Sequence, residues 1–181
     1  MSPGSGPRPV EVPAIVVTAA VVTREGKLLL TRRRDGDHLG GTWEFPGGKL
    51  HDGESPPQGL RRELAEELGV EAEVGDAFRF AWWEYPEKKV LLLFYRCRIV
   101  AGEPRPLECA EVGWFGEAEI GALPMPPADQ GILEDVRTLV RESLPEGNDA
   151  CCGDVNPDGP VRSPDSGLPR HGGTEKSPED F

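Results

Sequence analysis

Positively charged residues are scarce in this chain of 181 residues, which carries 20 Lys and Arg against 32 Asp and Glu and a formal net charge of −12. Proteins that hold a nucleic-acid duplex need clustered Lys and Arg to neutralise phosphates, so this balance argues against such a partner. It does not argue against a single nucleotide bound through metal ions, because the cation supplies local positive charge. No apolar run approaches the ~20 residues that cross a bilayer, and the first residues lack the apolar core of a signal peptide. We therefore expect a cytoplasmic protein without a membrane partner.

Cysteine is also rare, and the four residues have a spacing that fits no zinc pattern. A cytoplasmic chain would keep them reduced. Cys97 lies in a strand-like run, where we expect a small buried or half-buried side chain. Cys151 and Cys152 lie in a polar tail that lacks the amphipathic context of a palmitoylation site.

Large apolar side chains are nearly absent from both ends of the chain. Residues 1–12 are rich in Pro, Gly and Ser, and residues 146–181 are rich in Pro, Gly, Asp and Ser. Such segments cannot bury enough surface to offset the entropy of ordering, so we expect both to be disordered. A tail that recruits a partner is the alternative for the C-terminal segment. The remaining residues, 13–145, are expected to form one domain.

Strand and helix patterns interleave within this domain without strict alternation. Two pairs of β-branched or apolar runs predict hairpins, residues 14–23 with 27–33 and residues 77–85 with 89–100, and residues 110–116 predict a short strand. Residues 55–68 and 129–144 have helical spacing of their apolar positions. This order favours an α/β (α+β) fold, a sandwich of helices on a mixed β-sheet.

The first predicted helix carries its own boundary signals. Ser55 suits the N-cap, Pro56 suits the first turn, and Gln58 completes a Ser-x-x-Gln capping box. Gly69 stands where a left-handed C-cap residue belongs. The helix therefore has a defined start, a defined end and a predictable set of faces.

Acidic residues crowd one of these faces. The apolar stripe consists of Leu60, Leu64 and Leu68, and Glu63, Glu66 and Glu67 fall on the adjoining arc, at spacings that bring side chains together. Like charges at these spacings are destabilising unless a cation lies among them. All-oxygen ligands favour a hard cation, Mg²⁺ with Mn²⁺ as a substitute. The alternative is a solvated acidic face paired with Arg61 and Arg62.

The same residues resemble the Nudix box at every defined position: Gly48, then Glu54, then RELAEELGV at residues 62–70. The closest resemblance is to the MutT branch, because TRRRDGDHLGGTWEFPGGK, GEPRPLE, GWFG and PPAD also agree in order and spacing. It covers residues 14–144. It implies a Nudix-type α/β/α sandwich on a mixed sheet and a hydrolase that acts on phosphorus anhydrides, cleaving nucleoside triphosphates to the monophosphate and pyrophosphate.

The resemblance also implies roles for the acidic residues and their neighbours. Mg²⁺ ligands would be the Gly47 carbonyl, Glu63, Glu66, Glu67 and, from a loop outside the box, Glu108, for which Glu111 is a rival. The catalytic residues would be Glu63, Glu66 and Arg62. Glu63 is either a ligand or the general base, and Arg62 would orient the glutamates, with Glu54 as a partner.

A further set of residues would contact the nucleotide by the same resemblance: Arg33, His38, Glu44, Phe45, Pro46, Gly47 and Asp129. His38 has an alternative as an exposed loop histidine. Arg33 is flanked by Arg32 and Arg34, and we expect one of the three to meet phosphate. Tyr85, Lys88 and Trp83 lie in a hairpin that could cover the base, with outer-face strand positions as the alternative.

Asp129 leaves the base preference open. The MutT pattern has Asn in this motif, and an amide both donates and accepts, whereas an ionised Asp only accepts. A carboxylate can accept from the ring N–H and amine of guanine, or from the amino group of cytosine. A third interpretation is that Asp129 caps the last helix.

The resemblance implies a Mg²⁺-dependent enzyme that hydrolyses 8-oxo-dGTP to 8-oxo-dGMP and pyrophosphate, and so serves DNA repair and replication fidelity. The alternatives are a CTP or modified-dCTP pyrophosphatase and, from another class, a nucleotide-binding regulatory module without catalysis. We expect a monomer or a homodimer.

Overall fold

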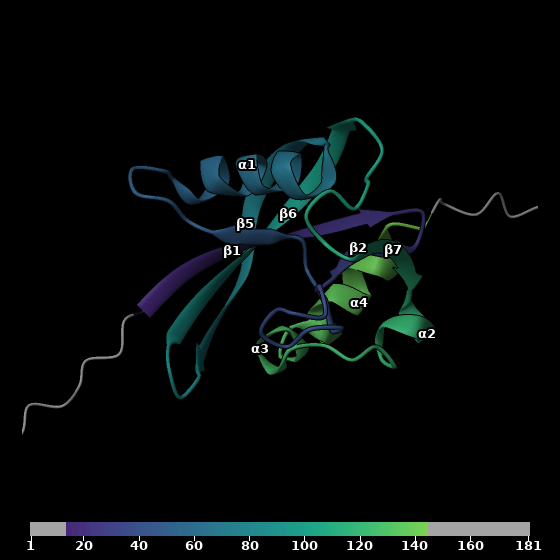
Figure 1. Cartoon of the computed structure of the whole chain (residues 1–181). Helices are drawn as coiled ribbons and strands as arrows, with labels where there is room; N and C mark the ends of the chain where they lie inside the picture. Colours follow the sequence, from purple (N-terminus) through teal and green to yellow (C-terminus); the bar gives the residue numbers. More distant parts are fainter. Residues whose placement is uncertain (1–13, 145–181) are drawn as a thin grey trace, which may run out of the picture. The chain divides into compact units, whose positions relative to one another are not determined.

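A computed structural model describes residues 14–144 of the chain (Figure 1). The predictions for residues 1–12 and 146–181, the domain boundaries beside them, and the pair Cys151 and Cys152 lie outside the described residues. No helix within residues 14–144 is long and apolar enough to cross a membrane.

Within residues 14–144 seven strands form one sheet, which is mixed, as predicted. They are β1 (Ala14–Arg24), β2 (Lys27–Arg32), β3 (Trp43–Glu44), β4 (Gly47–Lys49), β5 (Glu71–Glu84), β6 (Lys89–Ala101) and β7 (Glu111–Gly116). The main order is β3-β2-β1-β6-β5, with β4 beside β1 and β7 beside β2. β1 and β6 are parallel, and every other pair is antiparallel. The long β5–β6 hairpin confirms the predicted strand pair.

The first hairpin is paired over only a short distance. Glu25 and Gly26 turn the chain with φ of 52° and 72°, a left-handed pair typical of tight hairpins. The register then contains only Thr23 opposite Leu28 and Arg24 opposite Lys27. Beyond it the strands separate: β1 continues between β4 and β6, while β2 runs between β3 and β7. β1 and β2 therefore belong to two different halves of the sheet, and each half has its own set of paired strands.

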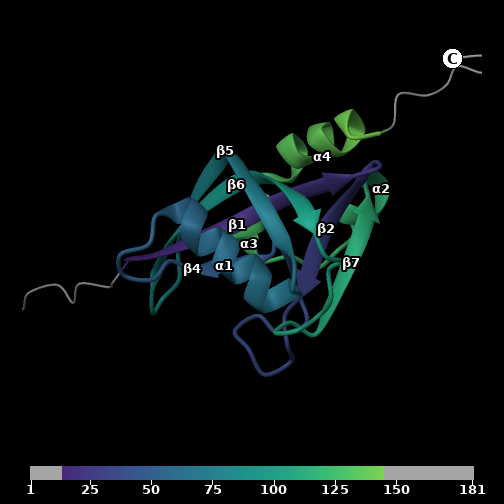
Figure 2. The ribbon, with the colours of Figure 1, turned by 90° about the horizontal axis from the view of Figure 1, so that it is seen from above.

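Helices cover both faces of the sheet, which confirms the α/β/α sandwich. Helix α1 (Pro56–Leu68) lies on one face, and α3 (Pro127–Gln130) and α4 (Leu133–Glu142) lie on the other (Figures 1 and 2). One buried cluster joins the α1 stripe to Leu29 and Val22. The other joins α4 to Leu28, Leu30 and Phe94. The leucines of β2 therefore alternate between the two core clusters, one on each face of the sheet.

The prediction that the last helix is continuous is wrong. Instead of one helix over residues 129–144, α3 ends at Gln130 and α4 begins at Leu133. Gly131, a poor helix former, lies in the break, and Ile132, with φ of −110° and ψ of 0°, is the N-cap of α4. This geometry leaves the Ile132 side chain 4% exposed.

Three short elements were not predicted: β3, β4 and α2 (Glu117–Ile120). Each has two to four residues, too few for a periodic pattern. β5 also begins at Glu71, six residues before the predicted start. Ala72 and Val74 pack against the α1 cluster, and register shifts interrupt the strand before Arg79.

Candidate active site

Helix α1 is fixed in rotation by its buried leucines. Leu60, Leu64 and Leu68 are at most 1% exposed, as the stripe predicted. The Ser55 backbone N–H donates to Gln58 Oε1 at 2.9 Å at the helix start. Gly69 ends the helix with φ of 68°, which confirms the left-handed C-cap. With the leucines against the sheet, Glu63 and Glu67 turn towards the Gly47–Gly48 segment.

Glycine is required at position 47, and at position 48 it lets a carboxyl lie directly against the backbone. A Cβ on Gly48 would lie 2.3 Å from the Glu63 carboxyl carbon, so that carboxyl rests directly on the backbone. Gly47 has φ of 148°, and its Cβ would lie 2.1 Å from the Thr18 carbonyl oxygen. The Gly47 N–H donates to Glu67 Oε2 at 3.1 Å. The two glycines thus let the backbone approach both glutamates.

Arg62 ties the surrounding carboxylates together. Its guanidinium donates twice to Glu54, at 2.7 and 3.0 Å, and once each to Glu63 and Glu66, both at 2.9 Å. It also donates to the Lys49 carbonyl at 3.1 Å. The expected partnership of Arg62 with Glu54 is therefore present. Glu66, whose side chain is 49% exposed, is held by Arg62 at the edge of the group.

The Glu67 carboxyl lies beside the glycine segment, near two other carboxylates. Burial raises the pKa of Glu67 to about 7, the Gly47 N–H and Thr31 lower it, and the charges of Glu44 and Glu63 raise it further. Burial also raises the pKa of Glu44, against the lowering effect of Arg33. Negative charge thus converges on Glu67 from both neighbours.

These residues fit a hard divalent cation in their chemistry. The donors are carboxylate and carbonyl oxygens, and a cation would offset the burial and the repulsion that raise the pKa of Glu67. Within residues 14–144, no three acidic, His or Cys side chains are already arranged around a common metal position. Glu63 and Glu66 point instead to the same nitrogen of Arg62.

The loop acids differ in position. The Glu108 backbone N–H donates to the Glu67 carbonyl at 3.3 Å, which brings this loop to the end of α1. The Glu108 side chain is exposed. Glu111, its rival, pairs with Arg32 at 3.6 Å. Only Glu108 is thus joined to the backbone of a box glutamate.

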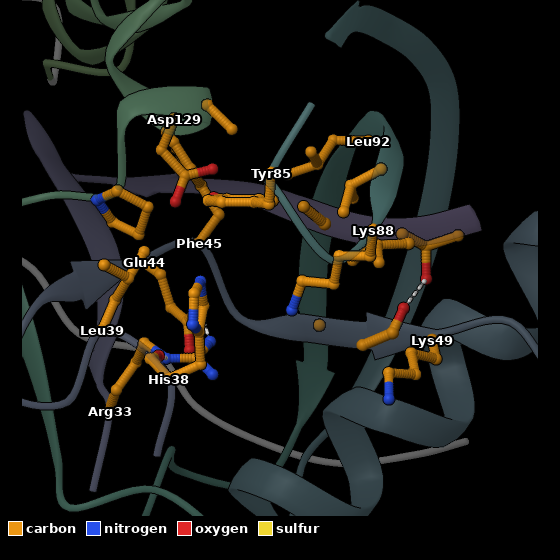
Figure 3. Close-up of a pocket in the computed structure, with 18 residues that line it drawn as sticks. Arg33, His38, Leu39, Glu44, Phe45, Lys49, Tyr85, Lys88, Leu92 and Asp129 are labelled. Carbon is orange, nitrogen blue, oxygen red and sulfur yellow. Dashed lines mark hydrogen bonds and ion pairs between the residues drawn. The ribbon is translucent and has the colours of Figure 1, made fainter. Parts of the chain in front are cut away.

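The glycine segment also lines a cavity of about 280 Å³ (Figure 3). Six of the seven residues expected to contact the nucleotide line it: Arg33, His38, Glu44, Phe45, Gly47 and Asp129. Pro46 does not line it. The Pro46 carbonyl accepts from the Ala20 N–H at 2.8 Å, and its buried ring supports the turn instead.

Arg33 is the one of the three consecutive arginines that lines the cavity. It donates to Glu44 and to the His38 carbonyl, both at 2.6 Å. Arg32 donates to the Gly41 carbonyl and Arg34 to the Leu107 carbonyl. Arg33 thus holds Glu44 and the His38 loop together at one wall.

The tip of the β5–β6 hairpin forms another wall. Tyr85 and Lys88 line the cavity, and the His38 ring meets the Tyr85 ring edge-on at 5.0 Å. His38 Nδ1 also lies 3.9 Å from Glu87. Trp83 lies outside the cavity and is 38% exposed, in agreement with an outer-face position.

Asp129 lies at one side of the cavity, opposite Lys49 (Figure 3). It is 4% exposed, and burial followed by the charge of Glu44 raises its pKa to about 8. The raised pKa favours the protonated carboxyl, which has one donor and one acceptor. The helix-cap interpretation is wrong, because Asp129 lies inside α3 and α4 begins after Ile132.

Several lining residues were not predicted, among them Thr18, Lys49 and Leu92. Thr18 and Leu92 reach the cavity because β1 pairs with β4 and β6, which no local pattern reveals. Thr18 Oγ1 donates to the Gly48 carbonyl at 3.4 Å. Lys49 could have been found, because it directly follows the glycine pair.

The comparisons with known proteins agree with this geometry. The family profile described as the NUDIX domain matches residues 17–135. The chain therefore belongs to the NUDIX family, and it is a hydrolase that acts on phosphorus anhydrides.

Two curated relatives are similar to the chain to nearly the same degree. The 8-oxo-dGTP diphosphatase of Haemophilus influenzae is 36% identical over 120 residues, which cover 66% of this chain and 88% of that protein. The CTP pyrophosphohydrolase of Escherichia coli is 37% identical over 125 residues, which cover 69% and 93%. Among solved structures, the MutT protein of Methanosarcina mazei has a TM-score of 0.65 at 28% identity, covering 72% of this chain and 97% of that chain. The comparisons thus establish the fold and the family.

Proposed function

We propose that the protein is a Mg²⁺-dependent nucleoside triphosphate pyrophosphohydrolase that converts 8-oxo-dGTP to 8-oxo-dGMP and pyrophosphate. One observation carries this proposal: the Gly47–Gly48 segment is at once a wall of the cavity and the backbone on which Glu63 and Glu67 rest. A base bound in the cavity would therefore direct its phosphates towards the glutamates. Removal of the oxidised nucleotide would keep it out of DNA.

The cavity residues suggest how the nucleotide is held. Phe45 and Leu92 offer apolar surface to the base, and Asp129 offers a neutral carboxyl to its edge. Lys49 and Lys88 line the same cavity and carry ammonium groups suited to phosphate. Arg33 is engaged by Glu44, so its role would be to keep this wall in place.

The box residues would hold the cation and the attacking water. Glu63, Glu66, Glu67 and the Gly47 carbonyl would be the ligands, with Glu108 reaching in from its loop. When bound, Mg²⁺ neutralises phosphate charge and lowers the pKa of water. Glu63, on the backbone of Gly48, would accept the proton of the attacking water. Arg62 would keep Glu63 and Glu66 oriented through its contacts with both.

A second candidate is hydrolysis of CTP or a modified dCTP. The observation that favours it is the carboxyl of Asp129, because its carbonyl oxygen can accept from the amino group of cytosine. The similarity to a CTP pyrophosphohydrolase is consistent with it. The two candidates share the metal site and differ at the base.

A substrate panel separates the candidates. We would measure kcat/KM for 8-oxo-dGTP, dGTP, CTP and 5-methyl-dCTP with Mg²⁺ on one preparation, and identify the products. The first proposal predicts the highest value for 8-oxo-dGTP, with nucleoside monophosphate and pyrophosphate as products. A value for a cytidine nucleotide about a hundredfold above that for 8-oxo-dGTP would establish the second candidate instead.

A further inference from the structure

The hydroxyl of Thr31 is buried without a hydrogen bond. Thr31 lies in β2 and is 0% exposed, and its Oγ1 has no hydrogen-bond partner among residues 14–144. A buried hydroxyl normally finds a partner, because removing it from water costs free energy. Thr18, also 0% exposed, satisfies this rule through the Gly48 carbonyl. Thr31 therefore needs an explanation.

The pattern of β2 shows which way Thr31 points. Leu28 and Leu30 belong to the α4 side of the core, and Leu29 belongs to the α1 side. Side chains alternate along a strand, so Thr31 points to the same side as Leu29, towards α1. On that side the Thr31 hydroxyl lowers the pKa of the Glu67 carboxyl, although it lacks the geometry of a full hydrogen bond.

Packing alone does not favour threonine at this position. The backbone of Thr31 pairs with Glu44 on one side and Val112 on the other, and neither pairing uses the hydroxyl. Valine has nearly the same shape, suits a strand equally well and would bury no polar group. The buried hydroxyl thus lowers the stability of the fold, so we expect it to have a role other than packing.

We propose that Thr31 is a positioning residue that donates a hydrogen bond to Glu67 and aims this carboxylate at the divalent cation. The proposal rests on the proposed function, in which Glu67 is a ligand. The carboxyl of Glu67 accepts from the Gly47 N–H at 3.1 Å, and a second donor from β2 would fix its plane. Groups that orient a metal ligand commonly change metal affinity by about 10- to 100-fold when they are removed.

The test compares Thr31→Val, which removes the donor, with Thr31→Ser, which keeps it. Thr23→Val is the matched control, because Thr23 is a partly buried threonine at the far end of β1, opposite Leu28. Each protein is titrated with Mn²⁺ by calorimetry without nucleotide, and its thermal unfolding and kcat and KM are measured.

We expect Thr31→Val to weaken Mn²⁺ binding at least about tenfold and to lower kcat similarly, with an equal or higher unfolding temperature. Thr31→Ser and Thr23→Val should bind Mn²⁺ within about twofold of the wild type. Wild-type Mn²⁺ affinity in Thr31→Val would overturn the proposal, as would an equal loss in Thr31→Ser. If the wild type bound Mn²⁺ but cleaved no nucleotide, the proposed function would fail, while the Mn²⁺ titrations would still decide the role of Thr31.

Discussion

Arg62 and Glu54 form an ion pair with two hydrogen bonds, Nε to Oε1 at 2.7 Å and Nη2 to Oε2 at 3.0 Å. The hydrogen bond from Arg62 lowers the pKa of Glu54 to about 2, so the pair is ionised at neutral pH. Glu54 also accepts from the His51 N–H at 3.0 Å. The pair thus links the loop before α1 to the helix, and it holds the guanidinium that also binds Glu63 and Glu66.

Replacement of Arg62 by Lys tests this arrangement. A single ammonium cannot reproduce the planar two-bond contact with Glu54 while also reaching Glu63 and Glu66. We expect kcat to fall by about 10- to 100-fold with little change in KM, measured as pyrophosphate release. Arg61→Lys is the matched control, because the exposed Arg61 precedes Arg62 on the same helix. Equal kcat in the two variants would exclude a positioning role for Arg62.

Glu67→Gln tests the role of the Glu67 carboxylate, which has the charges of Glu44 and Glu63 beside it. The amide keeps the shape of the side chain and can still accept from the Gly47 N–H, so we expect the fold to survive. Loss of the negative charge should weaken cation binding and lower kcat by on the order of a hundredfold or more. Both are measured by Mg²⁺ titration of activity, with exposed Glu71→Gln as control. Retention of wild-type activity by Glu67→Gln would show that another residue is the principal ligand.

The sequence predicted α1 and its glutamates well because the signals are local. The leucine stripe, the caps and the spacing of Glu63 and Glu67 all follow from the helical repeat and from residues within one segment. The structure adds what depends on distant pairing. β1 brings Thr18 to Gly48 across 30 positions of the chain, and no pattern in either segment announces that contact.

The last two helices of the domain were harder to predict, because their boundaries depend on tertiary packing and not on local signals. The apolar spacing of residues 129–144 fits one helix, and the break at Gly131 appears only when Ile132 is packed into the core. That break separates Asp129 from α4 and leaves its carboxyl at the cavity rather than at a helix cap. Its protonation state depends on burial and on Glu44, which lies 85 positions earlier in the chain, and so could not be inferred from the motif.

Gly48→Ala tests the contact between backbone and Glu63. The added Cβ would overlap the Glu63 carboxyl at 2.3 Å, so that carboxyl must move. A shift of about 1 Å in a catalytic group can cost on the order of a hundredfold in rate, and we expect a loss of that size in kcat. Gly36→Ala is the control, because its Cβ would meet nothing within 4 Å. Unchanged kcat in Gly48→Ala would place Glu63 outside the reaction, provided circular dichroism shows both variants folded.

Replacement of Asp129 by Asn should remove one contribution to the pH dependence of the free energy of unfolding. Asp129 has a folded pKa of about 8, above the ordinary value of 3.8, so the folded chain retains a proton that the unfolded chain releases. The protonated carboxyl therefore contributes its full stability below pH ~4, and this contribution is lost as the pH rises towards ~8. Asn does not titrate. The free energy of unfolding of the wild type, measured with urea and compared with that of Asp129→Asn, should therefore decrease from pH 5 to pH 8.

The preference of the enzyme for one base over another should also depend on the protonation of Asp129. Below pH ~8 the neutral carboxyl presents a donor and an acceptor, as an amide does, so Asp129→Asn should keep the ratio of kcat/KM for 8-oxo-dGTP to that for CTP. Above that pH the wild-type carboxylate only accepts, and the two proteins should diverge, while their Mg²⁺ requirement stays the same. Glu134→Gln, an exposed substitution on α4, controls for general effects of pH. A ratio that differs between wild type and Asp129→Asn already at pH 6 would mean that Asp129 binds the base in its ionised form.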